Sequence, residues 1–260
     1  MIVAQQALRP AERAQTFRAR HAAYCVPVGG KAPLITCGAE APGKPHDKFD
    51  ESPETFLYSV RDGRTVVGSS RLISYHPDLG LPAERLLAGR ALGLDLSQAM
   101  EASRLSLVPA YRDMNARRNA MLALFSAMLD GSMQKQCTVW VATLRGNVLV
   151  LLSMMKISIT LLDEEPIRPE PGVTVDGPMS GEPLFPVTID LLESAAWLFA
   201  DNTIGFQAIF KTDGPPVRYT VRQIRDVRVR TRTNLRIVAQ HMQEWKTSVR
   251  SQGITRGSHA

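Results

Sequence analysis

The chain lacks the long apolar run that would span a membrane, since its 260 residues contain no stretch of about 18 apolar residues. Near the start, Arg9, Glu12 and Arg13 stand where a secretion signal would need an apolar segment, so we expect a cytoplasmic protein. Cysteines are scarce, odd in number and without the spacing of a metal site, which indicates reduced thiols: Cys25, Cys37 and Cys137.

Two common kinds of catalytic motif are also missing. No Ser/His/Asp set and no glycine-rich phosphate-binding loop is visible. His46 and Asp47 offer only two metal ligands within a Gly/Pro-rich segment, so no metal site is expected. The apolar content of 44% and the charged content of 22% are ordinary for a globular protein, which excludes none of the common enzyme classes.

Basic residues are concentrated at the end of the chain. Residues 203–260 contain 11 Lys/Arg and 3 Asp/Glu, whereas residues 1–202 contain 20 Lys/Arg and 22 Asp/Glu. We therefore expect a domain over 1–202 and a basic extension over 203–260 that could attract nucleic acid, an acidic protein or an anionic membrane, or be only a solvated face. Alternating valine and arginine over 217–231 predicts an edge strand with a basic face, and a last helix follows over 234–250.

The remaining hydrophobic periodicity predicts an α/β or α+β fold, with one mixed sheet and helices on its faces. Asp62-Gly63 between two β-rich runs predicts a hairpin, and Gly68 in the second run indicates a bulge or a close backbone approach. The expected helices are 10–24, 119–136, 146–155 and the end of 187–199, and the expected strands are 56–60, 65–73, 105–108, 138–143, 157–162 and the start of 187–199.

The segment around Glu101 combines charged residues with the apolar/polar alternation of a strand. An acid, a hydroxyl and a guanidinium fall within four residues, at Glu101, Ser103 and Arg104, just before the apolar alternation that starts at Leu105. On a regular strand, Glu101 and Ser103 would point to one face and Arg104 to the other. Such charges are costly in a core unless they are paired or used, and by themselves they fit a solvated strand end.

Four short motifs, taken together, resemble those of the acyl-homoserine-lactone (autoinducer) synthases and of their relatives, the N-acyl amino acid synthases and exosortase-associated acyltransferases. The motifs occur in order over residues 10–200: Phe17-x-x-Arg20-x-x-x-Tyr24, Asp47-x-x-Asp50, Ser70-Arg71-Leu72 and Glu101-x-Ser103-Arg104. The resemblance implies an acetyltransferase-like fold. It also implies transfer of an acyl group from a carrier-protein thioester to the amine of a small molecule, with no tightly bound cofactor.

The same resemblance assigns roles to residues. The catalytic group would be Glu101, Ser103 and Arg104, with Glu101 taking a proton from the ammonium group, through water, and backbone N–H groups near a bulge at 105–108 holding the thioester oxygen. The substrate-binding residues would be Arg20, Tyr24, Asp47, Asp50, Arg71, Leu105, Leu107 and Thr143. Apolar residues that could line an acyl tunnel, or simply form core, are Leu124, Phe125, Met128, Val141, Leu149, Leu152 and Met155.

The acyl donor is expected to be an acyl carrier protein. Acetyltransferases that use coenzyme A place a glycine-rich turn at a helix start to bind the pyrophosphate, and residues 112–117 contain no glycine. Arg112, Arg117 and Arg118 could instead contact the acidic surface of a carrier protein.

Two alternatives stay open. Gly30 stands where the lactone synthases usually carry a tryptophan, so the amine substrate is either S-adenosylmethionine, giving an acyl-homoserine lactone, or a free amino acid. A second class of function is a non-catalytic relative that binds nucleic acid or a membrane through residues 203–260.

Overall fold

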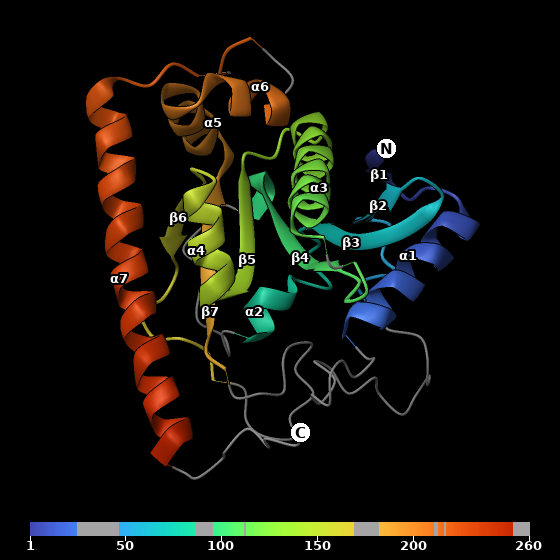
Figure 1. Cartoon of the computed structure of the whole chain (residues 1–260), viewed down its shortest axis with the longest axis horizontal. Helices are drawn as coiled ribbons and strands as arrows, with labels where there is room; N and C mark the ends of the chain where they lie inside the picture. The colour runs from blue at the N-terminus through green and yellow to red at the C-terminus, as the bar shows by residue number, and fades with distance from the viewer. Residues whose placement is uncertain are drawn as a thin grey trace.

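The computed structural model of the chain describes residues 1–24, 47–86, 96–111, 113–168, 182–210, 213–215 and 217–251. These residues form one seven-stranded mixed sheet with helices on both faces, as expected from the sequence (Figure 1). The strands are β1 (Ile2–Gln6), β2 (Thr55–Asp62), β3 (Thr65–Ser74), β4 (Ala99–Leu107), β5 (Val139–Arg145), β6 (Ser158–Leu161) and β7 (Leu184–Asp190). Their spatial order is β1-β2-β3-β4-β5-β7-β6.

The middle of the sheet contains a break in the pairing. Every neighbouring pair is antiparallel except β4 and β5, which run parallel. That parallel pairing covers only three residues on each strand, from Ala99–Val139 to Glu101–Val141. Beyond Glu101, β4 stays paired with β3 and β5 stays paired with β7, so the two central strands part from each other toward their C-terminal ends.

The two faces of the sheet differ in character. Leu72, Met100 and Trp140 point into the main core, which also contains buried side chains of α3 (Met114–Gln134). Because successive strand residues point to opposite faces, Arg71 and Glu101 lie on the other face. That face is covered by α1 (Pro10–Tyr24) and the short α2 (Pro82–Leu86), whose Ala83 packs with Val141.

The predicted helices and strands of the domain are largely confirmed. The remaining helices are α4 (Gly146–Met154), α5 (Leu191–Asp201), α6 (Thr203–Phe210), α7 (Val221–Ser251) and a 3-10 turn, η1 (Leu96–Gln98). Strand β1, helices α2 and α6 and the turn η1 were not predicted. The close approach expected at Gly68 is present, since a Cβ there would lie 2.5 Å from Leu107 Cδ2.

The predicted basic edge strand over 217–231 is wrong, because most of this segment belongs to the 31-residue helix α7. Thr220 and Gln223 form a capping box, in which Thr220 N–H donates to Gln223 Oε1 and Gln223 N–H donates to Thr220 Oγ1. The buried positions Val227, Thr231 and Val238 recur at helical spacing. Valine and arginine therefore alternate within a helix that has one apolar side.

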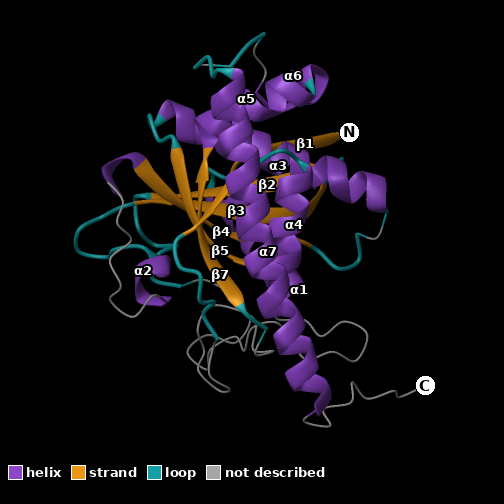
Figure 2. Ribbon diagram, turned by 90° about the vertical axis from the view of Figure 1, so that its left-hand side faces the viewer, coloured by secondary structure: helices purple, strands orange, loops and turns teal. Residues whose placement is uncertain are grey.

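Helix α7 runs along one side of the molecule and covers the edge strand β6 (Figures 1 and 2). The N–H of Ile159 donates to Thr231 Oγ1 across 3.4 Å, and Asn234 Nδ2 donates to the carbonyl of Ile159 across 2.9 Å. These side chains satisfy backbone groups that an exposed edge would leave open to another strand. Phe206 and Ile209 of α6 join the same main core.

No helix in the described ranges has both the length and the apolar character needed to cross a bilayer.

Candidate functional site

The site begins on the face of the sheet covered by α1 and α2, where β3 and β4 lie side by side. Arg71 and Ser103 are register partners, and Arg71 Nε donates to Ser103 Oγ across 3.1 Å. Glu101 is two residues before Ser103 on the same face. The expectation that Glu101 and Ser103 share a face is therefore confirmed.

Arg104 does not obey the strand alternation. Ser69 pairs with Ser106 and Arg71 pairs with Ser103, so β4 has one residue more than β3 between these pairs and forms a bulge. Arg104 has φ 57°, in the left-handed region that disfavours its side chain. Its Nη2 donates to Asp47 Oδ2 across 3.0 Å, the carboxylate that Arg71 also binds. The prediction that Arg104 points to the opposite face is wrong, because the bulge changes the phase of the strand.

Asp47 and Asp50 link the arginines. Arg71 Nη1 lies 2.7 Å from Asp47 Oδ1 and 3.1 Å from Asp50 Oδ1. Arg20 of α1 donates from Nη1 to both carboxylate oxygens of Asp50, at 2.9 and 2.8 Å. The turn itself is closed by Asp47 N–H, which donates to Asp50 Oδ2 across 3.0 Å. Five charged residues from four separate segments thus form one network, which we call the arginine–aspartate network: Arg20, Asp47, Asp50, Arg71 and Arg104.

This network is largely buried. Arg20, Asp50 and Arg71 are each at most 2% exposed. Burial raises the pKa of Asp47, but the guanidinium groups of Arg71 and Arg104 outweigh it and hold that pKa well below its usual range. Burial also lowers the pKa of Arg20, an effect that Asp50 opposes. The network thus places three guanidinium groups on the same face of the sheet as Glu101.

Glu101 has a different environment. It is 3% exposed, and its Oε2 accepts the backbone N–H of Ala83 across 2.7 Å. Burial raises the pKa of Glu101 to about 8, although the Ala83 hydrogen bond and the charge of Arg71 act in the opposite direction. A carboxyl group that titrates near pH 8 can take a proton from an ammonium group, and it lies where β4 and β5 separate.

The other expected substrate-binding residues lie on α1, β4 and β5. Tyr24 Oη donates to the carbonyl of Leu105 across 3.2 Å, and the guanidinium of Arg104 lies 5.9 Å from the Tyr24 ring centre. Leu107 packs in the main core. Thr143 lies two residues beyond the last β4–β5 pair, and its Oγ1 is buried without a hydrogen-bond partner among the described residues. Of the tunnel candidates, Val141 is on the α2 face, in a separate cluster from the others.

The expected carrier-protein contacts are spread over the start of α3. Arg112 lies outside the described residues. Arg117 is partly buried and donates from Nη1 to the carbonyl of Tyr111 across 2.6 Å, whereas Arg118 is exposed. Asp113 caps the helix by accepting the N–H of Ala116 across 2.6 Å.

Three contacts in the site were missed from the sequence. They are the Ala83 donor to Glu101, the bond from Arg13 Nη2 to the carbonyl of Asp50 at 2.8 Å, and the bond from Ser70 Oγ to the carbonyl of Ser103 at 3.2 Å. Arg13 could have been found, because it precedes Arg20 by seven residues and so lies on the same helix face. Ala83 gives no such signal, because its contribution is a backbone group.

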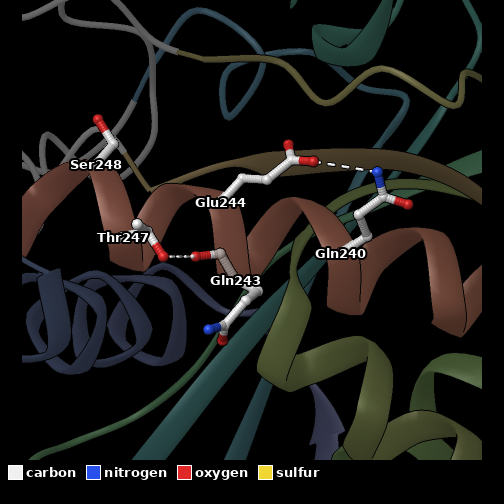
Figure 3. A pocket seen from close by; sticks show the side chains of 5 residues that line it. All are labelled: Gln240, Gln243, Glu244, Thr247 and Ser248. Carbon is white, nitrogen blue, oxygen red and sulfur yellow. Dashed lines mark hydrogen bonds between the residues drawn. The ribbon is translucent and has the colours of Figure 1, made fainter.

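Two other kinds of site were considered. The described residues contain no group of three or more potential metal ligands. Among the described residues, a depression beside the C-terminal half of α7 is lined by polar side chains of that helix (Figure 3): Gln240, Gln243, Glu244, Thr247 and Ser248. Glu244 accepts a hydrogen bond from Gln240 there, across 3.1 Å. None of these five residues belongs to the arginine–aspartate network.

Comparison with known proteins supports the fold. No family model matches the sequence, and no curated protein matches it either. Among solved structures, the chain resembles the CoA-dependent acyl-homoserine lactone synthase BjaI with MTA (TM-score 0.55, 19% identity, covering 88% of this chain and 99% of that one). It also resembles the AHL synthase LasI, with a TM-score of 0.55 and 14% identity, covering 85% of this chain and 99% of that one. A third similar structure is FeeM, an N-acyl amino acid synthase from uncultured soil microbes, with a TM-score of 0.52 and 17% identity, covering 75% of this chain and 93% of that one.

The chain shares the fold of these proteins, which are described as acyl-homoserine lactone synthases and as an N-acyl amino acid synthase, over most of their own length. The acetyltransferase-like fold that the sequence resemblance implied is thereby confirmed.

Proposed function

We propose that the chain is an N-acyltransferase that moves a fatty acyl group from a carrier-protein thioester to the amine of S-adenosylmethionine, giving an acyl-homoserine lactone. The observation that supports it most is the place of Glu101. It is a buried carboxyl group of raised pKa, at the last paired residue before β4 and β5 part, on the same face as the arginine–aspartate network.

The reaction needs two contributions from these residues: a base and donors for the thioester oxygen. Glu101 in its carboxylate form takes a proton from the substrate ammonium group, through water, so that the nitrogen acquires a lone pair. The amine then attacks the thioester carbon, the C–N bond forms, and the C–S bond breaks as the carrier thiol leaves with a proton. The carboxylate of the acylated S-adenosylmethionine next attacks the carbon beside its sulfonium, so that the C–O bond of the lactone forms, that C–S bond breaks and methylthioadenosine leaves. Backbone N–H groups of β4 beyond Glu101, on the side away from β3, have no partner strand in β5 and could hold the thioester oxygen.

The arginines of the network bear on the choice of amine. Both S-adenosylmethionine and a free amino acid carry a carboxylate beside the amine. Guanidinium groups such as those of Arg71 and Arg104 are suited to bind such an anionic group. Acylation of a free amino acid therefore remains the second candidate, supported by the similarity to FeeM.

The start of α3 bears on the donor. A helix N-terminus can bind the phosphates of coenzyme A through its free N–H groups. Here the carboxylate of Asp113 already accepts the Ala116 N–H, and it places a negative charge where phosphates would lie. This favours a protein-borne thioester over coenzyme A, although the similar protein BjaI is CoA-dependent.

One competition experiment tests the proposal. The purified protein receives an acylated carrier protein, or the matching acyl-CoA, together with S-adenosylmethionine and a mixture of amino acids, and the products are identified by mass spectrometry. We expect an acyl-homoserine lactone with the carrier protein as donor, and product formation at least about 100-fold slower from the Glu101→Gln variant. An N-acyl amino acid as main product would select the second candidate. Failure to acylate any amine would overturn the enzymatic function.

A further inference from the structure

The arginines of helix α7 point in two directions, some toward the domain and some away from it. Arg228 forms an ion pair with Asp201, and Arg230 forms one with Glu193, both on α5. Arg230 also donates to Ser158 Oγ of β6 across 3.1 Å. These two arginines hold the helix against the domain, so they contribute to the fold rather than to an external surface.

The other arginines of the first half of α7 point away from the domain. Arg222, Arg225, Arg232 and Arg236 are all exposed. At 100° per residue, spacings of three, seven and four residues keep them on one side of the helix, opposite the buried Val227 and Val238. We call this side the outer face of α7. Helix α7 faces the viewer in Figure 2.

The outer face has a clear positive charge. None of its four arginines has an ion pair or hydrogen bond within the described part of the chain. Asp226 is the one acidic residue between positions 221 and 236. The arginines span about 21 Å, since a helix rises about 1.5 Å per residue.

Exposed apolar side chains are interspersed with these arginines. Val221 is 86% exposed and Val229 is 53% exposed, and both belong to the outer face. Val217, which precedes the helix, is 43% exposed. The surface therefore combines fixed cations with valines that no described residue covers.

From this combination we propose that the outer face of α7 binds an anionic lipid surface, so that the protein associates peripherally with a membrane. Arginines pair with the phosphates and acidic headgroups, while the valines enter the interfacial region between headgroups and acyl chains. A nucleic acid would use the arginines but leave the valines without a partner. Moreover, residues 221–236 contain no aromatic side chain on which a base could stack.

The expected strength is modest. Each basic residue near an anionic bilayer strengthens binding by about fivefold at moderate ionic strength, so four give weak, reversible and salt-sensitive association. The inference does not depend on the reaction at Glu101, because it uses residues on the opposite side of the core.

Sedimentation with vesicles tests this directly. The full chain is mixed with vesicles of phosphatidylcholine alone or of equal parts phosphatidylcholine and phosphatidylglycerol, at about 0.05 and 0.3 M salt. We expect binding only to the anionic vesicles, weakened by salt. The R225E/R232E variant should bind at least about 25-fold more weakly, at about fivefold for each arginine lost.

A matched control separates a specific face from the general positive charge of the protein. Arg18 and Arg64 are exposed and lie on α1 and in the β2–β3 turn, so R18E/R64E changes the net charge by the same amount away from α7. This variant should bind anionic vesicles within about twofold of the wild type. An equal loss in both variants, or no binding to anionic vesicles at low salt, would overturn the proposal.

A second pair of measurements distinguishes lipid from other polyanions. V221S/V229S should reduce binding to anionic vesicles severalfold at 0.3 M salt, where the apolar contribution remains. The same variant should leave binding to a short duplex DNA unchanged. If the wild type bound the duplex more tightly than the vesicles, and the valine substitutions affected neither, the partner would be a polyanion and not a membrane. Circular dichroism confirms that each variant retains α7.

Discussion

Ala83 donates its backbone N–H to Oε2 of Glu101 across 2.7 Å, and this bond joins the first turn of α2 to the strand that carries the proposed base. Both residues are almost fully buried. The bond orients the carboxyl group while burial raises its pKa to about 8, so Glu101 is held in place and remains able to gain and lose a proton near neutral pH.

The pH dependence of acyl transfer should follow this carboxyl group. Because only the ionised form can accept a proton, kcat/KM should rise about tenfold per pH unit below pH 8 and level off above it. Glu101→Gln should lower kcat/KM by about 10²–10⁴-fold and abolish the rising limb. Initial rates at low amine concentration from pH 6 to 9.5 give the profile.

The exposed carboxylate of Asp226 offers a control for this measurement, since Asp226→Asn removes one negative charge on α7, away from α1 and α2. That variant should keep the wild-type profile. A Glu101→Gln protein with the wild-type rate and profile would exclude Glu101 as the base.

Folding stability should depend on pH through the same group, with a definite sign. The pKa of Glu101 is raised from 4.5 in the unfolded chain to about 8 in the folded protein. The unfolded chain therefore loses this proton first, and the folded state loses stability as pH rises from about 4.5 to about 8.

Glu101→Gln removes that loss, because glutamine has no proton to give up. The difference in Tm between variant and wild type should thus grow in favour of the variant between pH 5 and pH 9, as measured by thermal unfolding. Titration of all other groups cancels in the difference. A difference that is constant with pH would contradict the raised pKa.

The sequence predicted most of the sheet because its signals are local. The Asp62-Gly63 turn and the apolar periodicity of α3 and β5 each depend on neighbours within a few residues. The prediction of a strand at the start of α7 was wrong, because valine and arginine alternate with period two there over a short stretch, as in a strand. The capping pair Thr220 and Gln223, which decides in favour of a helix, is equally local and was overlooked.

In the candidate site, too, local features could be predicted and long-range contacts could not. The motifs named all five residues of the arginine–aspartate network, but the partner of each charge depends on chain segments 21 to 57 residues apart. The direction of Arg104 depends on a bulge, which requires knowledge of the register between β3 and β4. The contribution of Ala83 is a backbone N–H, and every residue but proline has one.

Gly68 should be intolerant of any side chain. A Cβ at this position would lie 2.5 Å from Leu107 Cδ2 and 2.6 Å from the carbonyl oxygen of Ser106, just beyond the bulge of β4. Gly68→Ala should lower the free energy of unfolding by about 1–3 kcal/mol, since the backbone must shift. Gly214→Ala, where a Cβ meets nothing within 4 Å, is the matched control and should change stability little. Urea unfolding of both variants measures the difference.

The cover of the β6 edge by α7 should also contribute to stability. Thr231→Val leaves the buried N–H of Ile159 without its acceptor, which should cost about 1–3 kcal/mol. Thr233→Val is the matched control, because Thr233 is exposed on the same helix. Urea unfolding should show a loss for the first variant only. Equal effects would mean that helix propensity, and not the bond to Ile159, is responsible.

Arg20 and Asp50 form a buried charge pair. Removing one of the two charges should destabilise the fold strongly, because the other charge stays buried. Asp50→Asn leaves Arg20, which is 0% exposed, without its full countercharge, and should cost about 3–5 kcal/mol. Arg20→Met should also be costly, but Asp50 keeps Arg71 at 3.1 Å, so the loss should be smaller. In the double variant the two losses should be less than additive, by more than about 1 kcal/mol, because each removes the same interaction. A double-mutant cycle by urea unfolding measures this coupling, and strictly additive losses would show that Arg20 and Asp50 do not depend on each other.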